Sequence, residues 1–137
     1  RAEGWAAIYE AITTSGLSVV AAHPVHAELR AASPKNAAKD PISLDAILVC
    51  KKQPSARISR FDQRKIIDRS VALASTLQGA GMSISKADRF VIVASQTLVA
   101  LSSANAECGA VCETIREVSQ AAQQDAAADV LERTAEL

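Results

Sequence analysis

Two short apolar stretches decide the fold: Leu17-Ser18-Val19-Val20-Ala21-Ala22, followed by His23-Pro24, and Leu44-Asp45-Ala46-Ile47-Leu48-Val49-Cys50. Each contains two β-branched residues, which favour strands. The first strand is expected to end near Pro24, because proline cannot donate a hydrogen bond at a central position of a sheet. The second has three contiguous large apolar residues, a pattern typical of a strand covered on both faces. The sequence therefore predicts strands over 17–24 and 44–50.

Helical spacing dominates on either side of these strands. Residues 2–14 place Trp5, Ile8, Tyr9 and Ile12 on one stripe, and Ser15-Gly16 follows as a stop signal. After Pro54 the apolar period changes to 3.6 residues and stays there, so we place a boundary between substructures at residues 54–55. Three further helices are predicted, with apolar faces formed by Ile66, Ile67, Ser70, Val71, Ala74 and Leu77; by Phe90, Val91, Ala94, Leu98 and Leu101; and by Val111, Ile115, Val118, Ala122, Val130 and Leu131.

The starts and ends of these helices carry recognisable signals. Gly79 and Gly81 close the first of the three. Ser85-x-x-Asp88 opens the second and resembles a capping box with Asp in place of the usual Glu. The third is expected over 107–134. The predicted fold class is therefore α/β over residues 1–54, followed by an all-α region over 55–137, and mostly helical overall.

The amino-acid composition is that of a single domain with a small hydrophobic core. The chain has 137 residues, of which 28 are Ala and only four are aromatic, so its helices must pack closely through small side chains. It contains no signal segment and no apolar run near the eighteen or so residues that a membrane span needs. Cys50, Cys108 and Cys112 form no even disulfide framework, which indicates a reducing compartment. We expect a cytoplasmic protein without membrane contact.

Metal binding is not expected from the cysteines. Cys108 and Cys112 stand four apart on the third predicted helix, which would place them on one face. A zinc site needs about four ligands, and no second pair supplies the rest.

Charge is balanced in total but not along the chain. Residues 1–60 hold eight Lys or Arg against five Asp or Glu, and residues 61–137 hold seven against ten. A polyanion would therefore prefer the first part. Residues 25–43 lack any period, are interrupted by prolines, and include Arg30, Lys35 and Lys39. A loop this long inside a compact unit is usually functional or disordered.

The sequence of residues 1–54 resembles that of a known protein family. The segments that carry the resemblance are Glu3-Gly4-Trp5, Gly16-Leu17, His23-Pro24-Val25-His26-Ala27-Glu28, Lys35-Asn36-Ala37-Ala38-Lys39-Asp40-Pro41-Ile42 and Asp45-Ala46-Ile47-Leu48-Val49-Cys50-Lys51-Lys52. They are similar to the last helix and terminal strand pair of adenine-specific DNA methylases, where a Trp-bearing helix leads to a Pro-x-x-x-Glu strand end and an Ile-Leu-Val-Cys-Arg/Lys strand. Residues 81–88 resemble, more weakly, a Gly-x-x-Leu-Ser-x-x-Asp turn that follows the catalytic domain in these proteins.

The resemblance implies a larger enzyme. The family fold is a doubly wound sheet whose last two strands form a hairpin, so the two predicted strands should pair antiparallel. The implied cofactor is S-adenosylmethionine and the implied substrate is adenine in DNA. Yet the chain has neither a Gly-rich turn after a first strand nor an Asp-Pro-Pro-Tyr-like segment to hold a flipped base. We therefore expect a carboxyl-terminal fragment, inactive alone, that works with a missing amino-terminal methyltransferase segment or subunit.

The candidate site residues follow from that resemblance. Arg30, Lys35 and Lys39 are the candidate DNA-binding residues, as phosphate contacts from a loop on the target-base side; the alternative is a solvated loop. Glu28 is either an orienting carboxylate at a strand end or a surface ion-pair partner. His23 and His26 could transfer protons, but the sequence offers no nucleophile or acid to act with them. They are therefore interpreted as strand-end or core histidines. We expect Trp5 to pack rather than to stack on a base.

Two further alternatives stay open. Seven basic residues lie between 51 and 69, against Asp62 and Asp68, and form either a nucleic-acid backbone surface or a solvated linker and helix face. Residues 55–137 could instead be a non-enzymatic helical interaction module, because Ala-rich helices leave a thin core that a partner would complete. No catalytic, cofactor-binding or metal residue is predicted in this chain.

Overall fold

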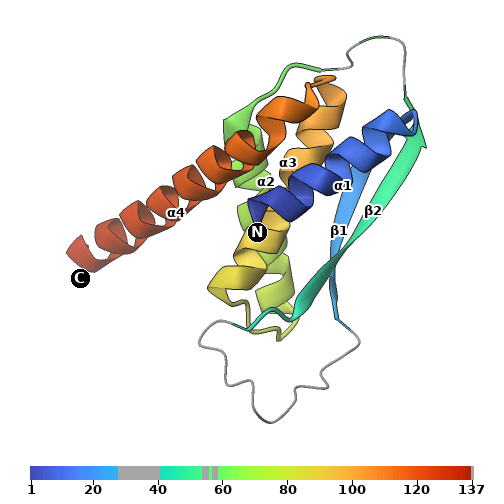
Figure 1. The fold of residues 1–137 in the computed structure, drawn as a ribbon. Helices are drawn as coiled ribbons and strands as arrows, with labels where there is room; N and C mark the ends of the chain where they lie inside the picture. Colours follow the sequence, from blue (N-terminus) through green and yellow to red (C-terminus); the bar gives the residue numbers. More distant parts are fainter. Residues whose placement is uncertain (28–40, 54–55, 57–58, 137) are drawn as a thin grey trace.

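The computed structural model describes residues 1–27, 41–53, 56 and 59–136. Its elements in chain order are α1 (Ala2–Thr14), β1 (Leu17–His26), β2 (Leu44–Lys52), α2 (Gln63–Gly79), α3 (Lys86–Ser103), the 3-10 turn η1 (Cys108–Ala110) and α4 (Val111–Ala135). One helix, an antiparallel hairpin and three helices follow one another, so the mostly helical α/β arrangement predicted from the sequence is confirmed (Figure 1).

The hairpin pairs residues far apart in the sequence. β1 and β2 run antiparallel from the pair Leu17 and Lys52 to the pair His26 and Leu44, with a bulge between Val19 and Ala21. β1 ends at His26, two residues beyond the predicted end near Pro24. Pro24 pairs with Ala46. Proline is tolerated there because each strand of a two-stranded sheet has an edge, where a missing N–H breaks no ladder.

Only one face of the hairpin is covered. Val19, Ala22 and Leu44 are buried on the inner face, against α3 and its neighbours. On the outer face Ile47 is 54% exposed and Val49 is 38% exposed. The prediction that the second strand is covered on both faces is therefore wrong for this chain. No second layer lies over the outer face in the part of the chain that the structure describes.

Helix α3 is the centre of the fold. The sequence predicts a single apolar stripe, whereas every residue from Val91 to Leu98 is buried. The hairpin covers one side of the helix, and α2 and α4 cover others. Its hydroxyl groups are satisfied locally: Ser95 donates to the carbonyl of Ile92 at 3.0 Å, and Thr97 donates to that of Val93 at 2.7 Å. Because these hydroxyl groups are hydrogen-bonded within the helix, α3 can bury Ser95 and Thr97 on several sides without leaving a polar group unsatisfied.

Helix α1 has the predicted bounds and docks through its tyrosine. Tyr9 is buried, and its hydroxyl donates to the carbonyl of Ala106 at 2.7 Å. Trp5 packs against two core clusters, which confirms its packing role, whereas Ile8 is exposed and lies off the buried stripe.

Helix α4 begins later than predicted. It starts at Val111, because residues 108–110 form a 3-10 turn instead of the first α-helical turn. Its buried residues lie in its first nine positions: Val111, Ile115, Val118 and Ser119. The second half extends away from the other helices (Figure 1). Val130 and Leu131, predicted on the apolar face, are 63% and 70% exposed. No helix in the described ranges is long and apolar enough to cross a membrane.

Candidate functional site

The predicted DNA-binding residues all belong to the loop between β1 and β2. Arg30, Lys35, Lys39 and Glu28 lie outside the described residues. The two ends of that loop are described, and they meet: the backbone N–H of Ala27 donates to the carbonyl of Ser43 at 2.9 Å. The site can therefore be built from the base of the loop upward.

A buried carboxylate fixes the base of this loop. One oxygen of Asp88 accepts hydrogen bonds from the backbone N–H groups of Ser43, at 2.8 Å, and Leu44, at 3.1 Å. The other oxygen accepts from the hydroxyl of Ser43, at 2.8 Å, and from the N–H of Ser85, at 3.1 Å. The start of β2 is thereby attached to the start of α3.

The same carboxylate caps α3. The hydroxyl of Ser85 accepts from the N–H of Asp88, so the predicted capping box is confirmed with Asp in the Glu position. Ser85 also donates its hydroxyl proton to the carbonyl of Pro41 at 2.7 Å. The local Ser-x-x-Asp spacing revealed the cap, but nothing in it revealed the link to residues 41–44, which stand over forty positions away.

Hydrogen bonding determines the charge state of Asp88. Burial alone would raise its pKa, but the bonds from Ser43 and Ser85 together outweigh burial and hold the pKa below its ordinary value. Asp88 is therefore an ionised, fully satisfied group at neutral pH. Because its acceptor positions are occupied, we assign it to positioning the loop base and not to proton transfer.

A cleft of about 330 Å³ lies beside this cluster. It is bordered by the loop base, the start of α3 and the preceding turn, with lining residues His26, Pro41, Ser43, Gly81, Met82, Ser83, Ser85 and Asp88. His26 is exposed at the end of β1, and its Nδ1 lies 3.1 Å from the carbonyl oxygen of Ala27. Hydroxyl groups and an imidazole thus face the root of the loop that carries the predicted phosphate-binding residues.

Neither histidine belongs to the core. His26 is a strand-end residue, as one of the two interpretations expected, and His23 is exposed on the outer face of β1 opposite Ile47. In the described part of the chain no three His, Cys, Asp or Glu side chains come together as metal ligands. Cys108 and Cys112 are half-buried and pack beside the core cluster that contains Tyr9.

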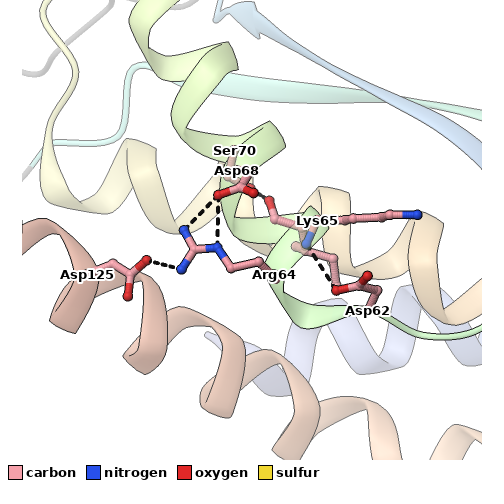
Figure 2. A network of polar contacts seen from close by, with 7 residues as sticks. Asp62, Arg64, Lys65, Asp68, Ser70 and Asp125 are labelled. Carbon is pink, nitrogen blue, oxygen red and sulfur yellow. Dashed lines mark hydrogen bonds and ion pairs between the residues drawn. The ribbon is translucent and has the colours of Figure 1, made fainter.

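The basic stretch at 51–69 divides into two kinds of residue. Arg64 bridges α2 and α4: it donates to Asp68 at 2.7 Å and to Asp125 at 2.5 Å (Figure 2). These carboxylates raise the pKa of Arg64 and neutralise its charge locally. Lys65 points away from this network in Figure 2. Among the described basic residues of the stretch, Lys51, Lys52, Arg60, Lys65 and Arg69 are exposed without an ion pair.

Two side chains of α3 hold the backbone of β1. Gln96 donates its Nε2 proton to the carbonyl of Ala22 at 2.9 Å, and the hydroxyl oxygen of Ser102 accepts from the N–H of Val19 at 3.1 Å. Neither residue was predicted from the sequence as a functional residue. Gln96 could have been noticed, because it is a glutamine inside an otherwise apolar helical stretch. A buried amide needs a specific hydrogen-bond partner, which would have pointed to a tertiary contact.

Comparisons with known proteins add no assignment. No protein-family model, curated protein or solved structure matches this chain.

Proposed function

We propose that this chain is the carboxyl-terminal part of an adenine-specific DNA methyltransferase, completed by another segment or subunit that binds S-adenosylmethionine and the target base. The chemistry rests on the resemblance of residues 1–54. The observation that supports a missing part is the apolar patch of Ala21, Ile47 and Val49 on the outer face of the hairpin, over which the described residues place no layer.

The outer face carries a small apolar patch among polar residues, since His23, Asp45 and Lys51 share that face. Ala21, Ile47 and Val49 form cross-strand neighbours on it, since Ala21 pairs with Val49 and His23 with Ile47. The side chains of Ile47 and Val49 are substantially exposed. A contiguous apolar patch on a strand pair is a site that another layer covers. The helices of a doubly wound sheet would supply that layer.

The edges of the hairpin also differ. On β1, Val19 and Ala22 already bond to side chains of α3, so these backbone groups cannot serve another strand. In the described ranges β2 pairs with β1 alone. The rest of a larger sheet would therefore add along β2, and the pair would form the end of that sheet.

The loop base fits the same proposal. The Asp88 cluster holds the two ends of residues 28–40 together, at one end of the strand pair. Ligands of α/β sheets gather at strand ends, where connecting loops meet. Arg30, Lys35 and Lys39 would contact DNA phosphates from this loop, and the exposed Lys51 and Lys52 lie at the opposite end of β2. Such an enzyme would act in the cytoplasm.

The first test concerns the complete gene product. We expect the coding sequence upstream of Arg1, or a companion gene, to encode a Gly-rich turn and an Asp-Pro-Pro-Tyr-like segment. The complete protein should then transfer labelled methyl groups from S-adenosylmethionine to adenine in DNA. The 137-residue chain alone should show no saturable binding of S-adenosylmethionine by calorimetry. Saturable binding by this chain, or a complete product without methyl transfer, would refute the proposal.

The second test concerns DNA contact by the loop. Changing Lys35 and Lys39 together to Ala in the complete enzyme should weaken DNA binding with little dependence on sequence. The slope of log affinity against log salt should fall by about two units, one for each lost phosphate contact. The measurement is the DNA dissociation constant over a salt series, with melting temperature as a control for folding. Equal slopes at equal stability would make the two lysines solubilising residues only.

A further inference from the structure

The outer edge of β2 carries backbone groups that can bond to another strand. On β1, the carbonyl of Ala22 and the N–H of Val19 bond to side chains of α3, so these groups point away from β2. In an antiparallel ladder the two residues of a pair direct their backbone groups alike, either both between the strands or both outward. Leu48 and Cys50 pair with Ala22 and Val19, so their own N–H and C=O groups point to the free edge of β2.

The same alternation adds Ala46, two positions before Leu48. Within the described ranges the outward groups of Ala46, Leu48 and Cys50 form no hydrogen bond. The available edge ends at Leu44, whose N–H already donates to the carboxylate at the start of α3. Helices α1 and α3 pack over β1 more than over β2, so they leave this edge open. Residues 46–50 contain neither charge nor proline, and an edge of that kind is a template for another strand.

The sequence of β2 is complementary to itself in the antiparallel direction. The residues on either side of Leu48 match in pairs: Ile47 with Val49, Ala46 with Cys50, and Asp45 with Lys51. The two inner pairs are apolar, and the outermost pair has opposite charges. Asp45 and Lys51 are both exposed, and neither forms an ion pair in the described part of the chain. A second β2, reversed about Leu48, would therefore meet matching apolar residues and opposite charges.

We propose that two copies of the 137-residue chain pair antiparallel through β2, with the two-fold axis at Leu48, and so form a four-stranded sheet. Leu48 would exchange both backbone hydrogen bonds with Leu48 of the other copy, and Ala46 would do the same with Cys50. In this register the outward groups of residues 46–50 all find partners in the same segment of the other copy. Each of the other contacts occurs twice, as a closed two-fold interface requires.

Charge distinguishes this register from its neighbours. With the axis at Leu48, Asp45 of each copy lies opposite Lys51 of the other on the outer face. Moving the axis back to Ile47 places Asp45 opposite Val49. Moving it forward to Val49 places Lys51 opposite Ile47. Directly facing opposite charges stabilise a strand pair, whereas like charges destabilise it. The strand that complements β2 in both charge and apolar pattern is therefore β2 of a second copy.

The dimer concerns the 137-residue chain by itself and does not rest on the methyltransferase proposal. The strands proposed to complete the sheet would use the same edge of β2, so the two occupants exclude each other. Edge pairing leaves the outer faces of both hairpins without a covering layer, and Ile47 gains only a cross-strand neighbour. A failure of the dimer would leave methyl transfer by the complete enzyme to be decided by its own assay.

Charge reversal provides a test that only this register passes. Asp45→Lys places a positive charge opposite Lys51 twice in the dimer, and Lys51→Asp places a negative charge opposite Asp45 twice. Sedimentation equilibrium over a concentration series should show a reversible dimer for the wild type, with a dissociation constant at least about tenfold higher for each variant. An equimolar mixture of the two variants restores both opposite-charge pairs and should form a heterodimer. Lys52→Asp, the same change one position later, is the matched control and should dimerise like the wild type.

Amide hydrogen exchange identifies the edge. In the monomer the outward N–H groups of Ala46, Leu48 and Cys50 are open to solvent, whereas those of Ile47 and Val49 point to β1. Raising the wild-type concentration should slow exchange at the first three, while the other two exchange slowly throughout. Circular dichroism and thermal melting check that the variants fold like the wild type. Three results would each overturn the proposal: a wild type that stays monomeric up to about 1 mM, reversed variants that do not associate when mixed, or a dimer without slower exchange at the three outward groups.

Discussion

Both faces of the hairpin carry apolar residues, but the surroundings of these residues differ. On the inner face Val19, Ala22 and Leu44 are buried against the helices. On the outer face Ala21, Ile47 and Val49 lie beside His23, Asp45 and Lys51 and have no layer over them in the described residues. An apolar pattern in a strand therefore does not show by itself which face is covered, since apolar residues are buried on one face of this hairpin and exposed on the other.

The largest expected difference between the faces comes from Leu44. Its side chain is 1% exposed and lies in a core cluster with Ala74, Val91 and Ile92. Replacing it with Ala removes buried methyl groups and leaves a cavity, which costs roughly 2 to 5 kcal/mol. Urea unfolding of the 137-residue chain, followed by circular dichroism, should show the midpoint fall at unchanged slope. A loss below about 1 kcal/mol would mean that the inner face is not part of the core.

The stability of Asp88→Asn measures how much the hydrogen bonds of Asp88 contribute to holding β2 against α3. Asp88→Asn keeps an acceptor for the N–H groups of Ser43 and Leu44 but presents an amide donor to the N–H of Ser85. Leaving that buried group unsatisfied should cost about 1 to 3 kcal/mol at neutral pH. Asp45→Asn, an exposed change on the same strand, is the matched control and should leave stability unchanged.

The pH dependence of Asp88 has a definite sign. Because the folded protein holds its pKa below the unfolded value, ionised Asp88 contributes stability above about pH 4. That contribution disappears as the pH falls through the folded pKa. Wild type should therefore lose more stability between pH 7 and pH 3 than Asp88→Asn does, measured by urea unfolding at both. Equal acid losses would show that Asp88 is not the carboxylate linked to folding.

The sequence allowed the elements to be predicted, because their signals are local. Helix α1 was found with its exact bounds, and the Ser85 cap with its reciprocal bonds. The burial of α3 and the contacts of Asp88 depend on tertiary packing and could not be predicted in this way. A hydrophobic period cannot show that α3 is enclosed on several sides, since that depends on which elements pack around it. Nor can it show that Asp88 binds Ser43 across the fold. Arg30, Lys35 and Lys39 lie outside the described residues, so their DNA-binding role stays a prediction from the basic, proline-rich loop and the family resemblance.

The smallest expected effect is also the one that separates the two faces most clearly. Ile47→Thr keeps the branching at Cβ that suits a strand and replaces the ethyl branch on the outer face with a hydroxyl group. Because Ile47 is already largely exposed, the free chain should change in stability by less than about 0.5 kcal/mol. In the complete enzyme, where another layer is proposed to cover this face, the new hydroxyl would be buried and the melting temperature should fall. Comparing the same substitution in both proteins, with Leu44→Ala as the reference for a covered position, measures the coverage directly. A loss in the free chain equal to that of Leu44→Ala would show that the outer face is already covered without a further segment. No loss in the complete protein would show that nothing covers it there, and either result would remove the observation that carries the proposed function.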